Sequence, residues 1–178
     1  MLMDTREKHN NGKCGLLYAG AGILLILSWL SLWFASNPAG LRALRYVGWL
    51  IFALGGVLIL LPILVLRSQG KPEEGKDWTH STVIVNRGLY AVVRHPLYLG
   101  WSLMYIAVAL FGQNWLTVFL AIPGIGCLYL ISREEDRQLL NKFGDAYARY
   151  VRSVPAMNIL VGVFRLLQHR ENTRRLES

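Results

Sequence analysis

The sequence predicts an all-α, polytopic membrane protein: a bundle of four membrane-spanning helices, followed by an amphipathic helix and a candidate short fifth membrane helix. Only 17% of the 178 residues are charged and 53% are hydrophobic, against a usual charged share of about 25%. The apolar residues fall in long blocks that contain almost no charge, which is typical of membrane spans. Basic residues flank these blocks. We therefore expect a single integral membrane domain over residues 1–178.

Four uncharged runs are the predicted spans. The first two contain 22 and 21 residues and are long enough to cross the hydrocarbon core at about 1.5 Å per residue. Pro62 is expected to kink the end of the second. The last two are shorter and form a predicted hairpin with its tip at Gly112, Gln113 and Asn114. The four runs cover residues 15–36, 46–66, 97–111 and 115–131.

The basic residues predict the orientation of these spans. Three precede the first run, five lie in the segment 67–94 and nine follow Ile131, whereas the connection 37–45 has two and the hairpin tip has none. Four spans thus place 17 basic residues on one side and 2 on the other. By the positive-inside rule both termini are expected in the cytoplasm, with the chain in the cell membrane.

The chain after the hairpin changes its periodicity. Apolar and aromatic residues recur there at spacings of three and four with charges between them, which predicts an amphipathic surface helix ended by Pro155. The apolar stretch 159–167 is too short to span with ease, so we expect it at the interface or tucked against the bundle. The helix is marked by Leu139, Leu140, Phe143, Tyr147 and Tyr150.

Several functional classes are disfavoured. Cys14 and Cys127 have no neighbouring ligands at metal-site spacing, so no metal is expected, and two cysteines make no disulfide framework. The net charge of +8 is better explained by anionic lipid headgroups than by nucleic acid. Glycines inside the spans are expected to serve close helix packing. The sequence leaves the oligomeric state open.

Two polar segments enter and leave the hairpin on the same predicted face. In the first, Arg94 and His95 stand before Pro96, a residue suited to a first helical turn, whose N–H groups favour acceptor-rich ligands. The alternative is that both residues only mark the headgroup boundary. In the second, Glu134 and Glu135 lie close to hydrocarbon, where carboxylates need a partner; the alternative is an ordinary charged helix start.

Together these segments can form one pocket with tyrosine faces, a histidine, helix N–H groups and a carboxylate. Such a pocket suits S-adenosylmethionine, because aromatic faces attract a sulfonium and a carboxylate can hold the methionyl ammonium. Methyl transfer from this cofactor mainly requires alignment and exclusion of water.

Two spaced motifs flank the hairpin. The first is Gly88-x-Tyr90-x-x-x-Arg94-His95-Pro96-x-Tyr98-x-Gly100. The second is Glu134-Glu135-x-x-x-Leu139-x-x-x-Phe143-Gly144-x-x-Tyr147-x-x-Tyr150, with Val154-Pro155 beyond it. In order and spacing, residues 82–155 resemble the isoprenylcysteine carboxyl methyltransferases and their phospholipid methyltransferase relatives, in a short form of prokaryotic type.

The resemblance implies an S-adenosylmethionine-dependent methyltransferase whose lipophilic acceptor enters from the membrane, with its cofactor-binding part over about 82–155. Glu135 would be the carboxylate for the cofactor. Arg94 and Arg133 are the basic side chains best placed at the mouth of such a site, and we expect them, Arg94 above all, to orient the acceptor. The other implied cofactor contacts are Thr82, Val83, Ile84, Val85, Tyr90, His95, Pro96, Leu97 and Tyr98.

Two questions remain open from the sequence. Family members that methylate prenylcysteine have a basic residue four positions before the glutamate, where this chain has Ile131, so a lipidated carboxylate, a phospholipid amine and a small isoprenoid all remain candidate acceptors. Membrane sterol and enone reductases, which use NADPH, share an Arg-His-Pro segment but tend to have tryptophan at the position of Tyr147. A non-catalytic membrane protein is the third alternative.

Overall fold

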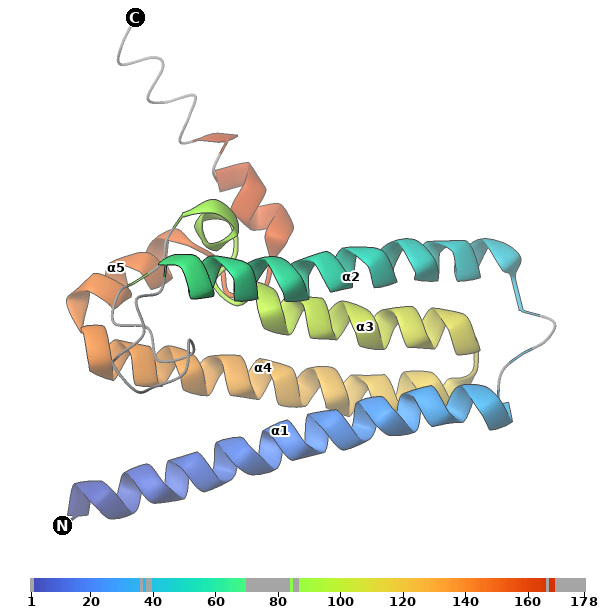
Figure 1. Ribbon diagram of the computed structural model, residues 1–178, viewed down its shortest axis with the longest axis horizontal. Coiled ribbons are helices and arrows are strands. Elements are labelled where there is room, and N and C mark those ends of the chain that lie inside the picture. Colours follow the sequence, from blue (N-terminus) through green and yellow to red (C-terminus); the bar gives the residue numbers. More distant parts are fainter. Residues whose placement is uncertain are drawn as a thin grey trace, which may run out of the picture. The chain divides into compact units, whose positions relative to one another are not determined.

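The computed structural model describes residues 2–35, 37, 40–69, 84, 87–165 and 167–168. Within these ranges all regular structure is helical, as predicted. Figure 1 shows the helices, and residues 159–165 form a further helical segment after the last labelled one. The labelled elements are α1 (Leu2–Ala35), α2 (Arg42–Gln69), the short 3-10 helix η1 (Gly88–Ala91), α3 (Pro96–Gly112), α4 (Trp115–Phe143) and α5 (Asp145–Ser153).

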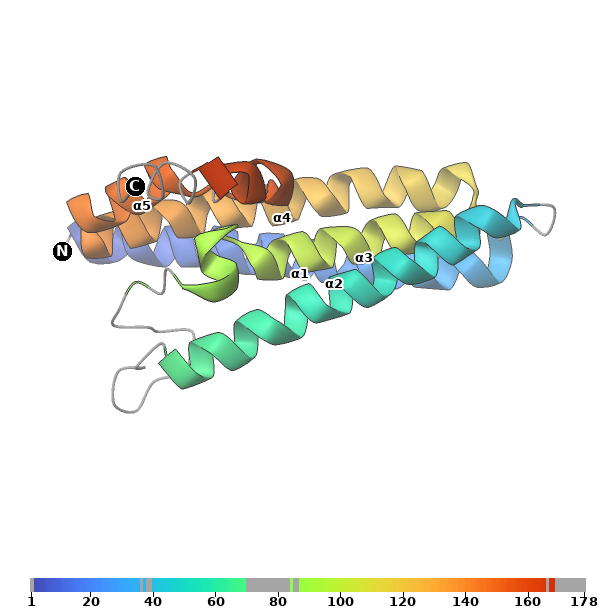
Figure 2. The ribbon, with the colours of Figure 1, turned by 90° about the horizontal axis from the view of Figure 1, so that it is seen from above.

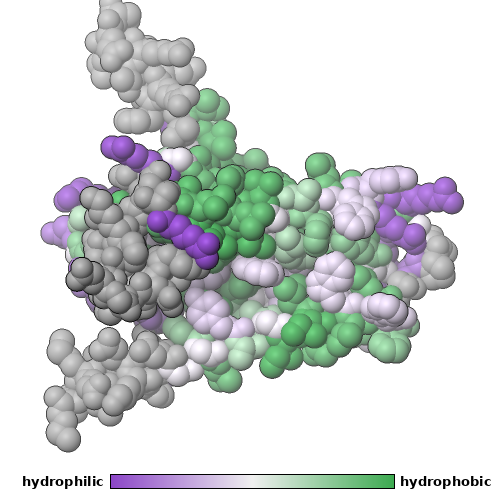
Figure 3. All heavy atoms as spheres, in the orientation of Figure 1, coloured by the Kyte–Doolittle hydropathy of each residue, from purple (hydrophilic) through white to green (hydrophobic). Residues whose placement is uncertain are grey.

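Within the described residues, three helical stretches are long and apolar enough to cross a membrane: Gly12–Ala35, Arg42–Arg67 and Trp115–Phe143. They correspond to three of the four predicted spans. Helix α3 is apolar but shorter, so its role as a fourth span stays a prediction. Figure 3 shows hydrophobic residues over the sides of these helices and hydrophilic residues beside the connection between α1 and α2. This distribution is the one expected of helices whose sides face lipid.

The chain divides into two compact units. The first comprises Met1–Val57 and Gly100–Arg137, and the second comprises Leu58–Leu99 and Gln138–Ser178. In the first unit, α1, α3, α4 and the first part of α2 run lengthwise beside one another (Figures 1 and 2). This unit is therefore a helix bundle.

Close contacts at glycines hold the bundle together. The Tyr105 hydroxyl on α3 donates a hydrogen bond to the Ala21 carbonyl on α1, and a Cβ on Gly124 of α4 would overlap the Tyr105 ring. A Cβ on Gly55 of α2 would lie 3.0 Å from the Gly100 carbonyl oxygen of α3. At these positions the predicted packing role of glycine is confirmed.

One end of the bundle joins the first connection to the hairpin tip. The Asn37 amide donates to the Gly112 carbonyl at 3.0 Å. The Gln113 side chain accepts from the Leu41 amide at 2.8 Å and donates to the Leu41 carbonyl at 2.9 Å. The connection and the tip therefore lie together, as the predicted orientation of the spans requires.

The chain after the hairpin does not form one separate amphipathic helix, which the change in periodicity had predicted. Helix α4 runs without interruption through the change from apolar to charged sequence, because no proline or glycine between Ile131 and Phe143 breaks its backbone hydrogen bonds. The break comes at Gly144, which has a φ of 55° that glycine adopts without strain. The amphipathic sequence is thus shared between the end of α4 and α5.

Candidate functional site

The second unit brings the Arg-His-Pro segment against the chain that follows α5. The Arg94 amide donates to the Pro155 carbonyl at 3.0 Å, and the His95 amide donates to the Ala156 carbonyl at 2.9 Å. Pro96, which has no amide hydrogen, begins α3 as predicted. Segments separated by about sixty residues are therefore fixed by their main chains, whatever side chains they have.

Two tyrosines of α5 support the same segment from inside. Tyr147 and Tyr150 are buried with Val154 in one apolar cluster, and Ile84 packs against it. The Tyr150 hydroxyl donates to the Tyr90 carbonyl in η1 at 2.7 Å. The tyrosines in the second sequence motif thus position the first motif.

The predicted cofactor contacts at the start of α3 lie largely inside the protein. His95 and Tyr98 are buried, with their ring centroids 5.7 Å apart. Pro96 is fully buried and Leu97 is half-buried. The first bond within the helix runs from the Leu99 amide to the His95 carbonyl at 3.1 Å, so the turn before it has the N–H groups of a helix start. The arrangement offers ring faces beside backbone donors.

The Arg94 side chain is not fully exposed. It is half-buried, and its Nε and Nη1 atoms are inaccessible. A residue that only reaches for headgroups would expose its guanidinium while burying its aliphatic stem. This burial favours a role inside a site over the role of boundary marker.

The acidic segment lies in the first unit, on α4. Glu134 and Glu135 are half-buried, and Asp136 is buried. Glu134 pairs with Arg137 at 3.3 Å, whereas Arg133 is exposed. Since His95 belongs to the second unit, the shared pocket of His95 and Glu135 stays a prediction.

Some predicted contacts lie outside the described residues, namely Thr82, Val83 and Val85. Ile84 is described, and its contacts are with the tyrosine cluster. Among the residues that the structure describes, no three His, Cys, Asp or Glu side chains form a group that could hold a metal ion.

Sequence reasoning missed the main-chain groups of the site. The carbonyls of Pro155 and Ala156 receive the Arg94 and His95 amides, although only the Val154-Pro155 pair of the motif pointed toward this segment. Gly162 was missed as well: a Cβ there would overlap the Val92 carbonyl. A lone glycine within the apolar stretch 159–167 was the available signal for this close approach.

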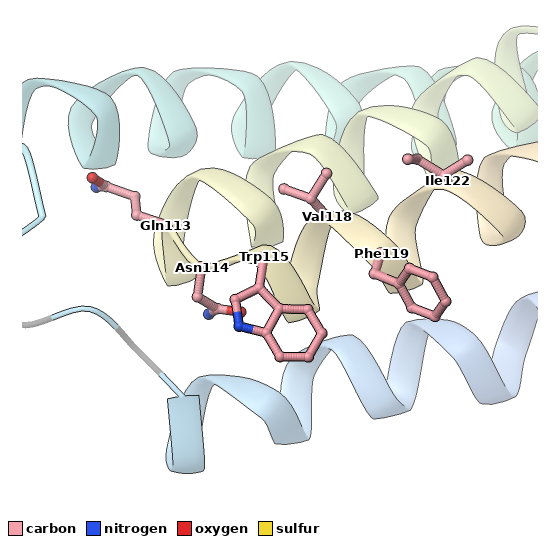
Figure 4. A pocket seen from close by; sticks show the side chains of 6 residues that line it. All are labelled: Gln113, Asn114, Trp115, Val118, Phe119 and Ile122. Carbon is pink, nitrogen blue, oxygen red and sulfur yellow. The ribbon is translucent and has the colours of Figure 1, made fainter.

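A different pocket lies at the hairpin tip (Figure 4). It has a volume of about 530 Å³ and a largely apolar lining. At about 1.5 Å per residue, α4 carries it roughly 30 Å from Glu135, so it is no part of the predicted cofactor site. Its lining residues are Gln113, Asn114, Trp115, Val118, Phe119 and Ile122.

Comparison with known proteins agrees with the motifs. The chain is similar to a methanethiol S-methyltransferase of Crocosphaera subtropica, with 27% identity over 83% of this chain and 60% of the relative. It is also similar to one of Mycobacterium tuberculosis, with 30% identity over 78% of this chain and 59% of the relative. The chain thus spans about 60% of the length of these relatives. No solved structure matches.

The family model described as phospholipid methyltransferase matches residues 44–146. The match covers more than half of the chain, including the start of α3, the hairpin and the acidic segment of α4. On this match, the chain belongs to the phospholipid methyltransferase family.

Proposed function

We propose that the protein is an S-adenosylmethionine-dependent methyltransferase that acts on a small lipophilic acceptor at the membrane face. The observation that carries this proposal is the fixation of the Arg94–His95 backbone by the Pro155 and Ala156 carbonyls. It builds a rigid, buried turn at the start of α3 from motifs far apart in the sequence. The family match favours this activity over the NADPH-dependent reduction that the sequence left open.

The residues of this turn fit the cofactor. When bound, S-adenosylmethionine supplies a methyl group on a positively charged sulfur. Tyr98 offers an aromatic face for such a charge, and the first turn of α3 offers backbone donors for acceptor groups. Burial of His95 and Tyr98 keeps water away from their rings, and Glu135 would hold the ammonium of the cofactor's methionyl part. Methyl transfer removes the positive charge from the sulfonium. These residues would therefore contribute mainly by aligning the reactants and excluding water.

The acceptor we propose has no carboxylate. Ile131, at the position where prenylcysteine enzymes have a basic residue, is apolar and 1% exposed, so it offers no charge partner for a carboxylate. Both curated relatives are named methanethiol S-methyltransferase, and a small thiol has no carboxylate that would need such a partner. Arg94 would favour its thiolate form, which is the nucleophile.

Product analysis tests this function. Protein in lipid nanodiscs is incubated with S-adenosylmethionine labelled in its methyl group, and with methanethiol, a phospholipid amine or a prenylated cysteine as acceptor. Mass spectrometry should find labelled dimethyl sulfide in far greater yield than either other product. Preferential labelling of the phospholipid or the prenylcysteine would overturn the choice of acceptor, and absence of label from all three would overturn the proposed activity.

We also propose that both termini and the segment around Lys76 are cytoplasmic, with the hairpin tip on the opposite side. The basic asymmetry of 17 to 2 supports this, as does the joining of the tip to the connection before α2. Single cysteines introduced at Asn114 and at Lys76, in a chain without Cys14 and Cys127, should react with impermeant reagents from opposite sides. Labelling of both from one side would contradict the orientation.

A further inference from the structure

The helical segment after α5 has an apolar face that is exposed among the residues that the structure describes. Its inner side is formed by Gly162, which is buried against Val92. Its outer side is hydrophobic, and Phe164 is 62% exposed there. The other exposed side chains of this face are Leu160, Val161, Val163 and Leu167. In Figure 3 this segment, found beyond α5 in Figure 1, is predominantly hydrophobic.

The described part of this segment is too short for its exposed apolar face to be explained as that of a membrane span. Its helical residues, 159–165 and 167–168, extend over about 15 Å, whereas a hydrocarbon core is about 30 Å thick. A helix of this length with one apolar face fits the headgroup boundary, where that face can be immersed without crossing.

Exposed basic side chains lie on this segment and on the helix before it. Arg149 and Arg152 are exposed on α5, on the side away from its buried tyrosines. Arg165 donates to the Arg152 and Ser153 carbonyls at 3.2 and 3.4 Å, and so caps the end of α5 and ties the two helices together. Exposed arginines beside an apolar face complement a surface of acidic lipids.

The same stretch of chain contacts the main chain of the Arg-His-Pro turn. The Pro155 and Ala156 carbonyls hold the Arg94 and His95 amides, and a few residues later Gly162 lies against the Val92 carbonyl. Because the connection from Pro155 to Ile159 is short, an interaction that fixes the position of the helical segment also fixes the position of these carbonyls.

We propose that residues 155–165 and 167–168 form a docking surface for anionic lipid, and that this docking stabilises the main-chain hydrogen bonds of Arg94 and His95. The exposed apolar face enters the headgroup boundary, and Arg149 and Arg152 bind acidic headgroups. This inference requires neither the cofactor nor a methyl acceptor, so it stands apart from the proposed methyl transfer.

Spin-label accessibility tests the docking. In a chain without Cys14 and Cys127, labels are placed at Phe164→Cys and, as the control, at Asn141→Cys, an exposed position near the end of α4. The protein is reconstituted in nanodiscs of phosphatidylcholine, alone or mixed with phosphatidylglycerol. The label at 164 should be accessible to oxygen and shielded from a polar nickel chelate, more strongly in the anionic discs, and the label at 141 should face water. Equal exposure of both labels to the chelate would overturn the proposal, as would dipolar coupling between labels at 164 showing that a second copy covers the face.

Hydrogen exchange tests the coupling to the turn. The peptide containing the Arg94 and His95 amides should exchange more slowly in the anionic discs. Arg149→Gln should remove about fivefold of this protection, and the matched charge removal Arg42→Gln on α2 should remove none. Exchange that is independent of lipid charge, or equally altered by the two substitutions, would overturn the coupling.

Discussion

The contacts that position the hairpin in the first unit differ from those that position the Arg-His-Pro turn in the second. In the first, side chains pack helix against helix: the Phe111 ring of α3 lies 5.0 Å from the Trp49 ring of α2, and Gly124 admits the Tyr105 ring. In the second, main-chain groups of irregular segments bind one another, as Arg94 binds Pro155. Packing specifies where helices lie, whereas main-chain bonds fix the direction of a turn. The difference teaches that the candidate site is built where the chain departs from regular helices.

The largest effect is expected from filling the tightest contact of the first unit. Gly124→Ala places a methyl group in the Tyr105 ring, which is buried and bonded to the Ala21 carbonyl, so that bond must break or α4 must move. We expect unfolding in detergent to become easier by about 1 to 3 kcal/mol, measured from the denaturation midpoint. Gly126→Ala, two residues along with nothing within 4 Å, is the matched control. Equal effects of the two substitutions would mean that the close contact at Gly124 is unimportant.

The next prediction concerns the acidic segment of α4. Glu135→Ala should weaken binding of S-adenosylhomocysteine about tenfold to a hundredfold, because a charge-assisted contact of about 1.5 to 3 kcal/mol is lost. Glu134→Ala is the control, since that carboxylate is bonded to Arg137. Calorimetry measures both. If the two variants lose affinity equally, the acidic segment acts through its total charge and not through a contact of Glu135.

Arg94→Ala tests the role of this side chain in the second unit. We expect turnover to fall more than about tenfold while cofactor affinity changes less, because we propose that the partly buried guanidinium orients an anionic acceptor group through charge-assisted bonds. Arg133→Ala should have a smaller effect, because Arg133 is exposed. Parallel losses of affinity and turnover in Arg94→Ala would instead assign Arg94 to the cofactor site or to the fold.

The sequence predicted the parts of the fold that depend on hydropathy. The long uncharged runs lie in α1, α2 and α4, as expected from their length and hydropathy. Pro96 begins α3, as expected because proline suits a first helical turn. The division of α4 from α5 at Gly144 was missed, since periodicity does not show where a helix with a continuous hydrogen-bond pattern will end.

The site was predicted through its side chains and not through its main chain. Arg94, His95 and Tyr98 were identified because their residue types suggest chemistry. The carbonyls of Pro155 and Ala156 could not be identified in this way, because every residue has one and only the folded chain shows which is used. The predicted partnership of His95 and Glu135 depends on the placement of the two units, which local sequence patterns do not determine.

The measurement that tests the central claim most directly is a calorimetric titration of the purified protein with S-adenosylhomocysteine and, separately, with NADPH. We predict saturable binding of S-adenosylhomocysteine, markedly weakened in a folded His95→Ala variant, and no binding of NADPH. Binding of NADPH in place of S-adenosylhomocysteine, or unchanged affinity of the His95→Ala variant for S-adenosylhomocysteine, would contradict a methyl-donor site at the start of α3.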